Sequence, residues 1–295
     1  MLLSDFKLGH DDTRETNPAN SPVRVIAVTS GKGGTGKTNI AVNLSMALAE
    51  EGHRTLLLDA DLGMANVDVL LGLQVHHTLS DVLDDKCRLE DIINDEIDNL
   101  LVIPAASGIK QLAETGVHEC AGLIRAFSDL KNPVDTFVID TATGISESVS
   151  SFCRAATEIL VVVCNEPASI RDSAAQIRML FSEYRITRFR ILANMVETAA
   201  DGESLFRNML HLFAHNHDIS ITFAGYIPAD DELRKAVSDH RSVITACPRS
   251  RSAMAIKGLA RRVMGWPRPE HASGHLEFFV ERLVNCDNVK TEVMT

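Results

Sequence analysis

The run Val25-Ile26-Ala27-Val28-Thr29-Ser30-Gly31-Lys32-Gly33-Gly34-Thr35-Gly36-Lys37-Thr38 decides how this chain folds. Its first four residues are apolar and predict a buried strand, the glycines follow at once, and the residues from Lys37 onward continue with helical spacing. A strand, a glycine-rich turn and a helix, in that order, are the context in which G-x-x-x-x-G-K-[ST] binds phosphate. We therefore expect the chain to bind ATP and to hydrolyse it.

The loop residues have different expected tasks. Backbone N–H groups should surround the phosphates, and the helix N-terminus should add the positive end of its dipole. Lys37 should reach the β- and γ-phosphates, and the Thr38 hydroxyl should bind Mg²⁺. The alternative, a glycine-rich turn without a ligand, does not require Lys followed by Thr. The predicted nucleotide-binding residues of the loop are Gly31, Lys32, Gly33, Gly34, Thr35, Gly36, Lys37 and Thr38.

Short apolar runs alternate with helical patterns along the rest of the chain. The predicted strands are 23–29, 55–58, 100–103, 136–139, 159–163, 189–193 and 221–226. The predicted helices are 37–50, 117–129, 146–156, 169–183 and 202–215. Continuous apolar strands separated by helices indicate a doubly wound α/β fold, with a mostly parallel sheet and helices on both of its faces.

The domain organisation follows from where this alternation begins and ends. Residues 1–22 show no sustained period and predict a flexible tail, and residues 23–266 carry the ATPase domain. Pro267 and Pro269 separate a C-terminal segment, 267–295, in which Leu276, Phe279, Val280 and Leu283 predict one apolar helix face within 274–284.

Composition excludes several classes of protein. The 295 residues carry a formal net charge of -11, which argues against direct binding to nucleic acid. The 6 cysteines form no C-x-x-C pair, as expected of reduced cysteines in the cytoplasm. The N-terminus soon becomes polar and acidic, and no apolar run approaches ~18 residues. We expect a cytoplasmic protein that is neither exported nor membrane-spanning.

Acidic residues follow two of the predicted strands. Asp59 and Asp61 come after strand 55–58, and Asp140 ends strand 136–139. Ligands of open α/β sheets bind beyond the carboxyl ends of the strands. An apolar strand that delivers one Asp is the Walker B arrangement, which holds Mg²⁺ through water, so Asp140 is a predicted metal residue. The alternative for the Asp59 loop is that it caps the next helix.

The general phosphate-loop motif does not demand Lys32. With it, the loop resembles that of the deviant Walker A ATPases of the MinD and ParA type, K-G-G-x-G-K-T. The resemblance implies that Lys32 crosses a face-to-face ATP dimer to the partner's phosphates and that Asp61 positions the attacking water, so Lys32, Lys37 and Asp61 are the predicted catalytic residues. It also implies that Asp59 supports Mg²⁺ through its water shell and that Asn66 lies near the dimer interface. The alternative for Lys32 is a solvated loop lysine.

The same resemblance implies adenine contacts and further dimer contacts. Asn194, Pro228 and Asp230 would border the adenine, since Asn offers both a donor and an acceptor; ordinary turn chemistry is the alternative. Glu166 and Asp172 would pair with Lys32 across the dimer; helix capping by Ser169 with Asp172 fits equally well.

Two positions depart from the family pattern. Thr143 stands before Gly144, which adds bulk and a hydroxyl to switch II, the loop after the Walker B strand, and Met195 replaces a basic residue after the asparagine.

The segments 102–108, 121–128 and 274–284 resemble one branch of this family, the FlhG/FleN-type regulators of flagellar number. The resemblance implies an ATP-dependent homodimer that restrains polar flagella and is reset by slow hydrolysis. It further implies two partners, a signal-recognition-type GTPase and an enhancer-binding activator of flagellar genes. Residues 1–22 lack the D-Q-A-x-x-L-R segment through which many relatives stimulate that GTPase.

The branch also implies that helix 274–284 contacts the cytoplasmic membrane from its inner face or at the pole. A helix docked on its own domain is the alternative. Two other functions remain open: a ParA-like partitioning ATPase, which the acidic charge disfavours, and a metabolic ATP-dependent enzyme, for which the sequence offers no acceptor-binding machinery.

Overall fold

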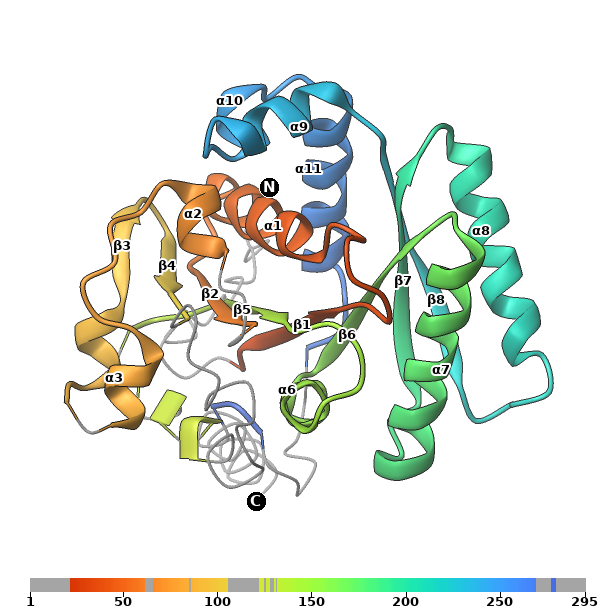
Figure 1. Cartoon of the computed structure of the whole chain (residues 1–295), viewed down its shortest axis with the longest axis horizontal. Helices are drawn as coiled ribbons and strands as arrows, with labels where there is room; N and C mark the ends of the chain where they lie inside the picture. The colour runs from red at the N-terminus through yellow and green to blue at the C-terminus, as the bar shows by residue number, and fades with distance from the viewer. Residues whose placement is uncertain are drawn as a thin grey trace, which may run out of the picture.

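The computed structural model describes residues 22–61, 66–84, 86–105, 122–124, 126–127, 130, 132–268 and 277–279. Within these residues, strands form one sheet of eight in the order β3-β4-β2-β5-β1-β6-β7-β8 (Figure 1). The strands are β1 (Arg24–Thr29), β2 (Thr55–Ala60), β3 (Asn94–Ile97), β4 (Leu100–Ile103), β5 (Thr136–Thr141), β6 (Glu158–Cys164), β7 (Arg188–Val196) and β8 (Ser220–Pro228). Every neighbouring pair is parallel except β3 and β4. The predicted doubly wound α/β fold is confirmed.

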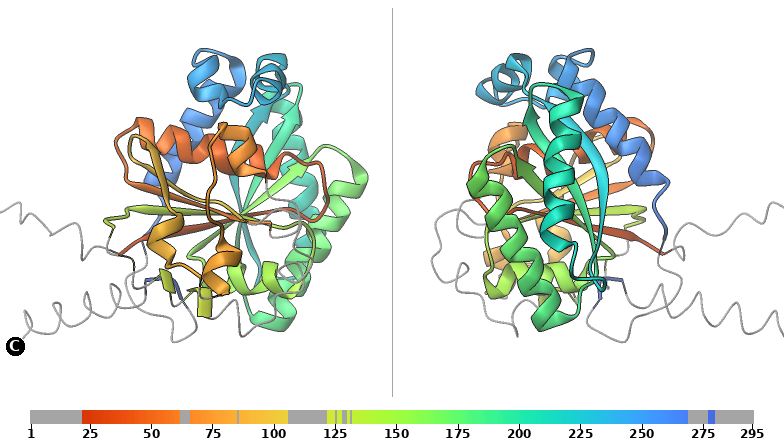
Figure 2. Two further views of the ribbon diagram at one scale, coloured as in Figure 1. Left: turned by 60° about the vertical axis from the view of Figure 1, so that its left-hand side comes forward. Right: turned by 90° about the vertical axis from the view of Figure 1, so that its right-hand side faces the viewer.

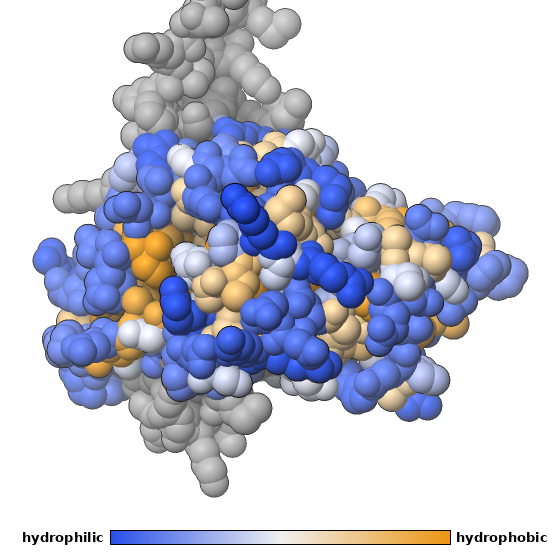
Figure 3. Space-filling view, turned by 90° about the horizontal axis from the view of Figure 1, so that it is seen from above, coloured by the Kyte–Doolittle hydropathy of each residue, from blue (hydrophilic) through white to orange (hydrophobic). Residues whose placement is uncertain are grey.

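Helices cover both faces of the sheet. They are α1 (Lys37–Glu50), α2 (Val67–Leu71), α3 (Leu79–Leu83), the 3₁₀ helix η2 (Leu89–Ile92), α6 (Glu147–Ala155), α7 (Pro167–Tyr184), α8 (Ala199–Phe213), α9 (Asp231–Ser238), α10 (Val243–Ala246) and α11 (Arg251–Met264). One face carries α1 and α11, with α9 and α10 beyond them, and the other carries α6 and α7 (Figures 1 and 2). Seen from above, the surface over α9 to α11 is mostly hydrophilic (Figure 3).

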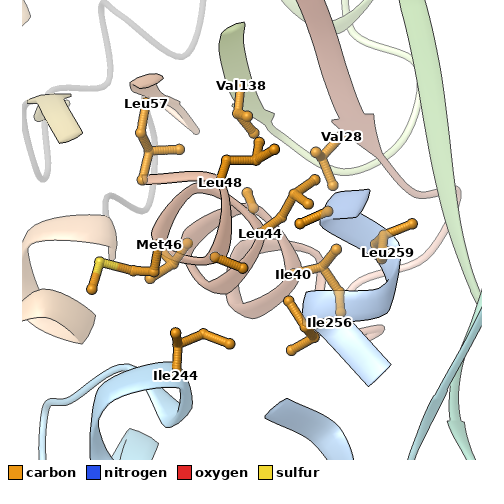
Figure 4. Packing of buried hydrophobic residues seen from close by; sticks show 14 of the residues in the cluster. Val28, Ile40, Leu44, Met46, Leu48, Leu57, Val138, Ile244, Ile256 and Leu259 are labelled. Atoms are coloured by element: carbon orange, nitrogen blue, oxygen red, sulfur yellow. The ribbon is translucent and has the colours of Figure 1, made fainter. Parts of the chain in front are cut away.

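Helix α1 begins directly after the phosphate loop and occupies the centre of one core. Figure 4 shows Leu44 and Leu48 facing Val28 and Val138 of the sheet, while Ile256 of α11 packs from the other side. A helix that is apolar on nearly all sides must be buried on nearly all sides. The loop that precedes α1 is therefore held between a buried strand and a buried helix.

Several strands extend further than predicted at their carboxyl ends. Asp59, Asp140 and Asn194 lie inside β2, β5 and β7 rather than after them. Asp and Asn have low strand propensity, but each of these residues has a ladder partner on a neighbouring parallel strand, and this tertiary pairing overrides the propensity. The polar strand β3 and the short helices α2, α3, α9 and α10 were not predicted, because short polar segments lack a measurable apolar period.

The C-terminal segment reaches the core. Residues 1–21 and most of 274–284 lie outside the described residues, but 277–279 form a turn in which Phe278 and Phe279 are 2% and 1% exposed. Both rings contact Phe137, and Phe278 also lies against Phe127 and Phe152. Phe279 has a φ of 56°, so the backbone is not helical at this point of the predicted helix. Among the described helices, none is both long and apolar enough to cross a bilayer.

Candidate nucleotide-binding site

Three glycines of the loop are required for different reasons. Gly34 and Gly36 have φ angles of 79° and 82°, in the region that side chains disfavour. Gly31 lies against the backbone of α7, where a Cβ atom would approach the carbonyl carbon of Asp172 to 2.3 Å. The loop shape therefore depends on backbone freedom at two positions and on close helix packing at a third.

The loop forms one wall of a cavity of about 450 Å³. The lining residues are Gly33, Gly34, Thr35, Gly36, Lys37, Thr38, Asn39, Asp61, Asn66, Val69, Leu70, Thr143, Val237 and His240. The structure thus places Asp61 beside the loop, as its position after a strand predicted, and it places Asn66 there as well. The catalytic role of Asp61 and a dimer contact by Asn66 stay predictions. Its apolar side, formed from α2 and α9, was not predicted, because the sequence does not show that these short helices meet there.

Lys37 and Asp140 form a buried ion pair at the base of this cavity. Lys37 Nζ donates to Asp140 Oδ1 at 2.8 Å, and the two side chains are 4% and 1% exposed. Thr38 lies close enough to the same carboxylate to lower its pKa. The second oxygen, Asp140 Oδ2, is buried and has no hydrogen-bond partner among the described residues. This carboxylate can therefore accept one more cationic or donor group.

Asp59 stands beside Asp140 in the sheet register. Its carboxylate accepts hydrogen bonds from the backbone N–H groups of Asp61, Asn66 and Val67. Burial raises the pKa of Asp59 to about 7, and the neighbouring charge of Asp140 adds to the rise, while the three N–H groups oppose it. The alternative that the Asp59 loop caps the next helix is thus also realised, since the N–H groups of Asn66 and Val67 lie at the start of α2.

The two carboxylates fit Mg²⁺. Burial likewise raises the pKa of Asp140, although Lys37 and Thr38 lower it. Adjacent buried carboxylates in this condition are stabilised by a divalent cation, and hard oxygen ligands suit Mg²⁺. Asp140 and Thr38 would hold the ion directly or through water. Asp59, whose oxygens already accept backbone hydrogen bonds, would contact the ion only through water. Bound there, Mg²⁺ would neutralise phosphate charge.

The residues expected at the adenine do not line this cavity. Asn194 donates from Nδ2 to the Thr35 carbonyl at 2.7 Å, so it supports the loop, while its buried Oδ1 has no partner among the described residues. Asp230 caps two helices, accepting from Glu232 N of α9 and from Ser252 N of α11. The turn chemistry left open by the sequence is therefore what Asp230 performs here.

Pro228 ends β8 and likewise does not line the cavity. An adenine contact by Asn194, Pro228 or Asp230 stays a prediction.

Lys32 is held outside the cavity. Its Nζ atom lies 2.5 Å from Glu166 Oε2 of the same chain, and the side chains are 40% and 59% exposed. The hydrogen bond and charge of Glu166 raise the pKa of Lys32, which stays a cation. Asp172 forms an ion pair with its neighbour Arg171, and its charge also contributes to the raised pKa of Lys32. The predicted pairing with Lys32 across a dimer remains a prediction for both acidic residues.

This geometry is that of a phosphate-loop ATPase of the MinD/ParA type. The family model described as the CobQ/CobB/MinD/ParA nucleotide binding domain matches residues 26–243, and the chain belongs to this family. The structure resembles that of the septum site-determining protein MinD from Pyrococcus horikoshii, complexed with Mg-ADP, with a TM-score of 0.68 and 27% identity, covering 82% of this chain and 96% of that one. The family match and the likeness to a structure with Mg-ADP confirm two predictions from the sequence. The chain is an ATPase, and it uses ATP or ADP with Mg²⁺.

The sequence is similar to particular members of the family as well. It is 49% identical over 263 residues to the antiactivator FleN of Pseudomonas aeruginosa, covering 89% of this chain and 94% of that protein. It is 28% identical over 238 residues to the flagellum site-determining protein YlxH of Helicobacter pylori, covering 80% of each. The predicted membership of the flagellar-regulator branch is confirmed.

Proposed function

We propose that this ATPase is a dimerising switch that restrains the number and placement of polar flagella, and that slow hydrolysis resets it. The observation that carries the proposal is the position of Lys32. A lysine inside a phosphate loop that served its own nucleotide would point into its own cavity, but Lys32 does not line the cavity and is paired with Glu166 instead. An exposed cation beside a phosphate site can stabilise the phosphates of a second chain.

The switch then follows from local electrostatics. ATP brings a γ-phosphate to the mouth of the cavity, and Lys32 exchanges Glu166 for the partner's phosphates, so that two chains complete each other's sites. Asp61 lines the cavity, where it can position the attacking water. Loss of the γ-phosphate removes the anion that holds Lys32, and the ion pair with Glu166 forms again.

Light scattering tests the dimer. With Mg-ATP the wild-type mass should double, whereas Lys32→Ala should remain a monomer and Asp61→Ala should stay dimeric for longer. Lys86→Ala is the matched control, because Lys86 also forms an exposed ion pair, with Asp84, but is not part of the phosphate loop. A wild-type chain that stays monomeric at saturating ATP would refute the proposed dimerisation switch.

Counting flagella tests the cellular role. Deletion of the gene should raise the number of polar flagella per cell, and a copy carrying Lys32→Ala should not restore it, while a Lys86→Ala copy should. An unchanged number and placement in the deletion strain refutes the flagellar assignment. The same strains allow pull-down of the two proposed partners, the signal-recognition-type GTPase and the enhancer-binding activator, with and without ATP.

We extend the proposal to peripheral membrane contact through segment 274–284. Phe278 and Phe279 are buried in the core, so these rings must leave it before they can enter a bilayer. The Glu277 carboxylate gives anionic lipid little electrostatic attraction. Sedimentation with vesicles of phosphatidylethanolamine and phosphatidylglycerol should show binding with Mg-ATP and not with Mg-ADP. Equal sedimentation with both nucleotides would contradict release by ATP.

A further inference from the structure

Helix α7 lies against the loop and against switch II. Its backbone at Asp172 and Ser173 touches Gly31 so closely that a Cβ atom on Gly31 would lie 2.3 Å from each. One turn further along the same face is Gln176, which is 0% exposed. The other buried residues of this helix are Ser169, Ser173, Ala174, Ile177 and Leu180. Gln176 therefore has the longest polar side chain among the buried residues of α7.

Gln176 connects two separate parts of the site. Its Nε2 atom donates to the Thr29 hydroxyl at 2.9 Å and to the Gly144 carbonyl at 2.6 Å. Thr29 ends β1 immediately before the loop, and Gly144 follows Thr143, which lines the phosphate cavity. Both donor positions of the amide are thus used to tie switch II to the base of the phosphate loop.

Gly144 is held at both of its backbone polar groups. Its carbonyl accepts from Gln176, and its N–H donates to the Ser30 carbonyl at 3.0 Å. Its φ of 86° is one that glycine adopts without strain. The Thr143–Gly144 peptide therefore borders the cavity with its N–H group occupied by the loop, and that N–H becomes available to a phosphate only when the bond to Ser30 opens.

A purely structural role explains the glutamine poorly. Burying an amide costs free energy unless its groups are bonded, and Gln176 Oε1 has no partner among the described residues. An apolar side chain of the same length would fill the space without burying the unpaired Oε1 atom, but it would also remove the donor to the Thr29 hydroxyl and the Gly144 carbonyl. The amide is more readily understood from the two groups it joins than from the packing of the helix.

We propose that Gln176 is a positioning residue for ATP hydrolysis. It fixes the Gly144 carbonyl to α7, so that switch II turns about this point and presents the Gly144 N–H to the terminal phosphate in one orientation. Gln176 does not line the cavity and acts only through Gly144. The inference rests on the hydrolysis step of the proposed function and is independent of flagella, membrane and partner proteins.

The test compares Gln176→Met with Ser173→Ala. Met keeps the length of the side chain and removes both donors, while Ser173 is equally buried on the same helix and its hydroxyl has no partner among the described residues. Loss of one positioning hydrogen bond should lower kcat about tenfold. The KM for ATP and the Kd for Mg-ADP should stay within about twofold. Ser173→Ala should match the wild type in all three.

Hydrogen exchange supplies a readout that does not depend on turnover. In the Mg-ADP form, the peptide that spans 141–147 should exchange faster in Gln176→Met and at the wild-type rate in Ser173→Ala. A kcat within twofold of the wild type overturns the proposal. So does a loss of nucleotide affinity that parallels the loss of kcat in both Gln176→Met and Gln176→Ala, because that would make the residue structural. A wild-type protein without ATPase activity would instead refute the proposed function.

Discussion

Replacement of Gly31 by alanine is the sharpest test of how the loop is built. The new Cβ atom would lie 2.3 Å from the carbonyl carbon of Asp172, whereas ordinary contacts begin at 3.4 Å. The opposing atoms belong to the backbone of α7 and cannot rotate away, so the loop or the helix must move by roughly 1 Å. Overpacking of this kind costs about 1–3 kcal/mol. In a domain of this size such a loss lowers Tm by about 2–12 °C.

The matched control is Gly33→Ala in the same loop. A Cβ atom on Gly33 would meet nothing within 4 Å, and Gly33 has no positive φ. Alanine also restricts the unfolded chain, by about 0.4–1 kcal/mol, and this effect is the same in both variants and cancels between them. Thermal unfolding without nucleotide should show Gly31→Ala melting clearly below Gly33→Ala. Equal Tm values would refute the packing of α7 against the loop.

Three further outcomes are expected. Phe278→Ala should lower the free energy of unfolding by about 3–5 kcal/mol. Met254→Ala, which changes a side chain that is 55% exposed, should alter that free energy by less than about 0.5 kcal/mol. Urea unfolding measures the free energy for both variants. Arg24→Met should destabilise the chain by about 2–3 kcal/mol, because the buried guanidinium donates to the Trp266 carbonyl at 2.8 Å; an unchanged urea midpoint argues against that anchor. Asp140→Asn should make ADP affinity independent of Mg²⁺ in calorimetry, and a retained Mg²⁺ dependence would remove Asp140 from the metal site.

The sequence predicted the fold well because its signals are local and strong. The apolar strands and the glycine-rich turn before Lys37 can each be recognised from a few consecutive residues, and α1 begins and ends where it was expected. The signals that failed are those of polar or short elements. β3 reads N-D-E-I and forms a strand only because β4 pairs with it, so its partner rather than its composition decides its conformation.

The candidate site shows the same difference between features that local sequence predicts and features that depend on distant contacts. The sequence by itself determined the phosphate loop, the acidic residues at the strand ends and the extra lysine, because each chemical task demands a residue type at a fixed spacing. Only the tertiary structure decided that Lys32 rests on Glu166 of its own chain and that Asp230 serves as a helix cap. It alone brought Gln176 to Gly144, 32 residues away. Contacts between distant residues depend on how helices lie across the sheet, and no local pattern of residues records that arrangement.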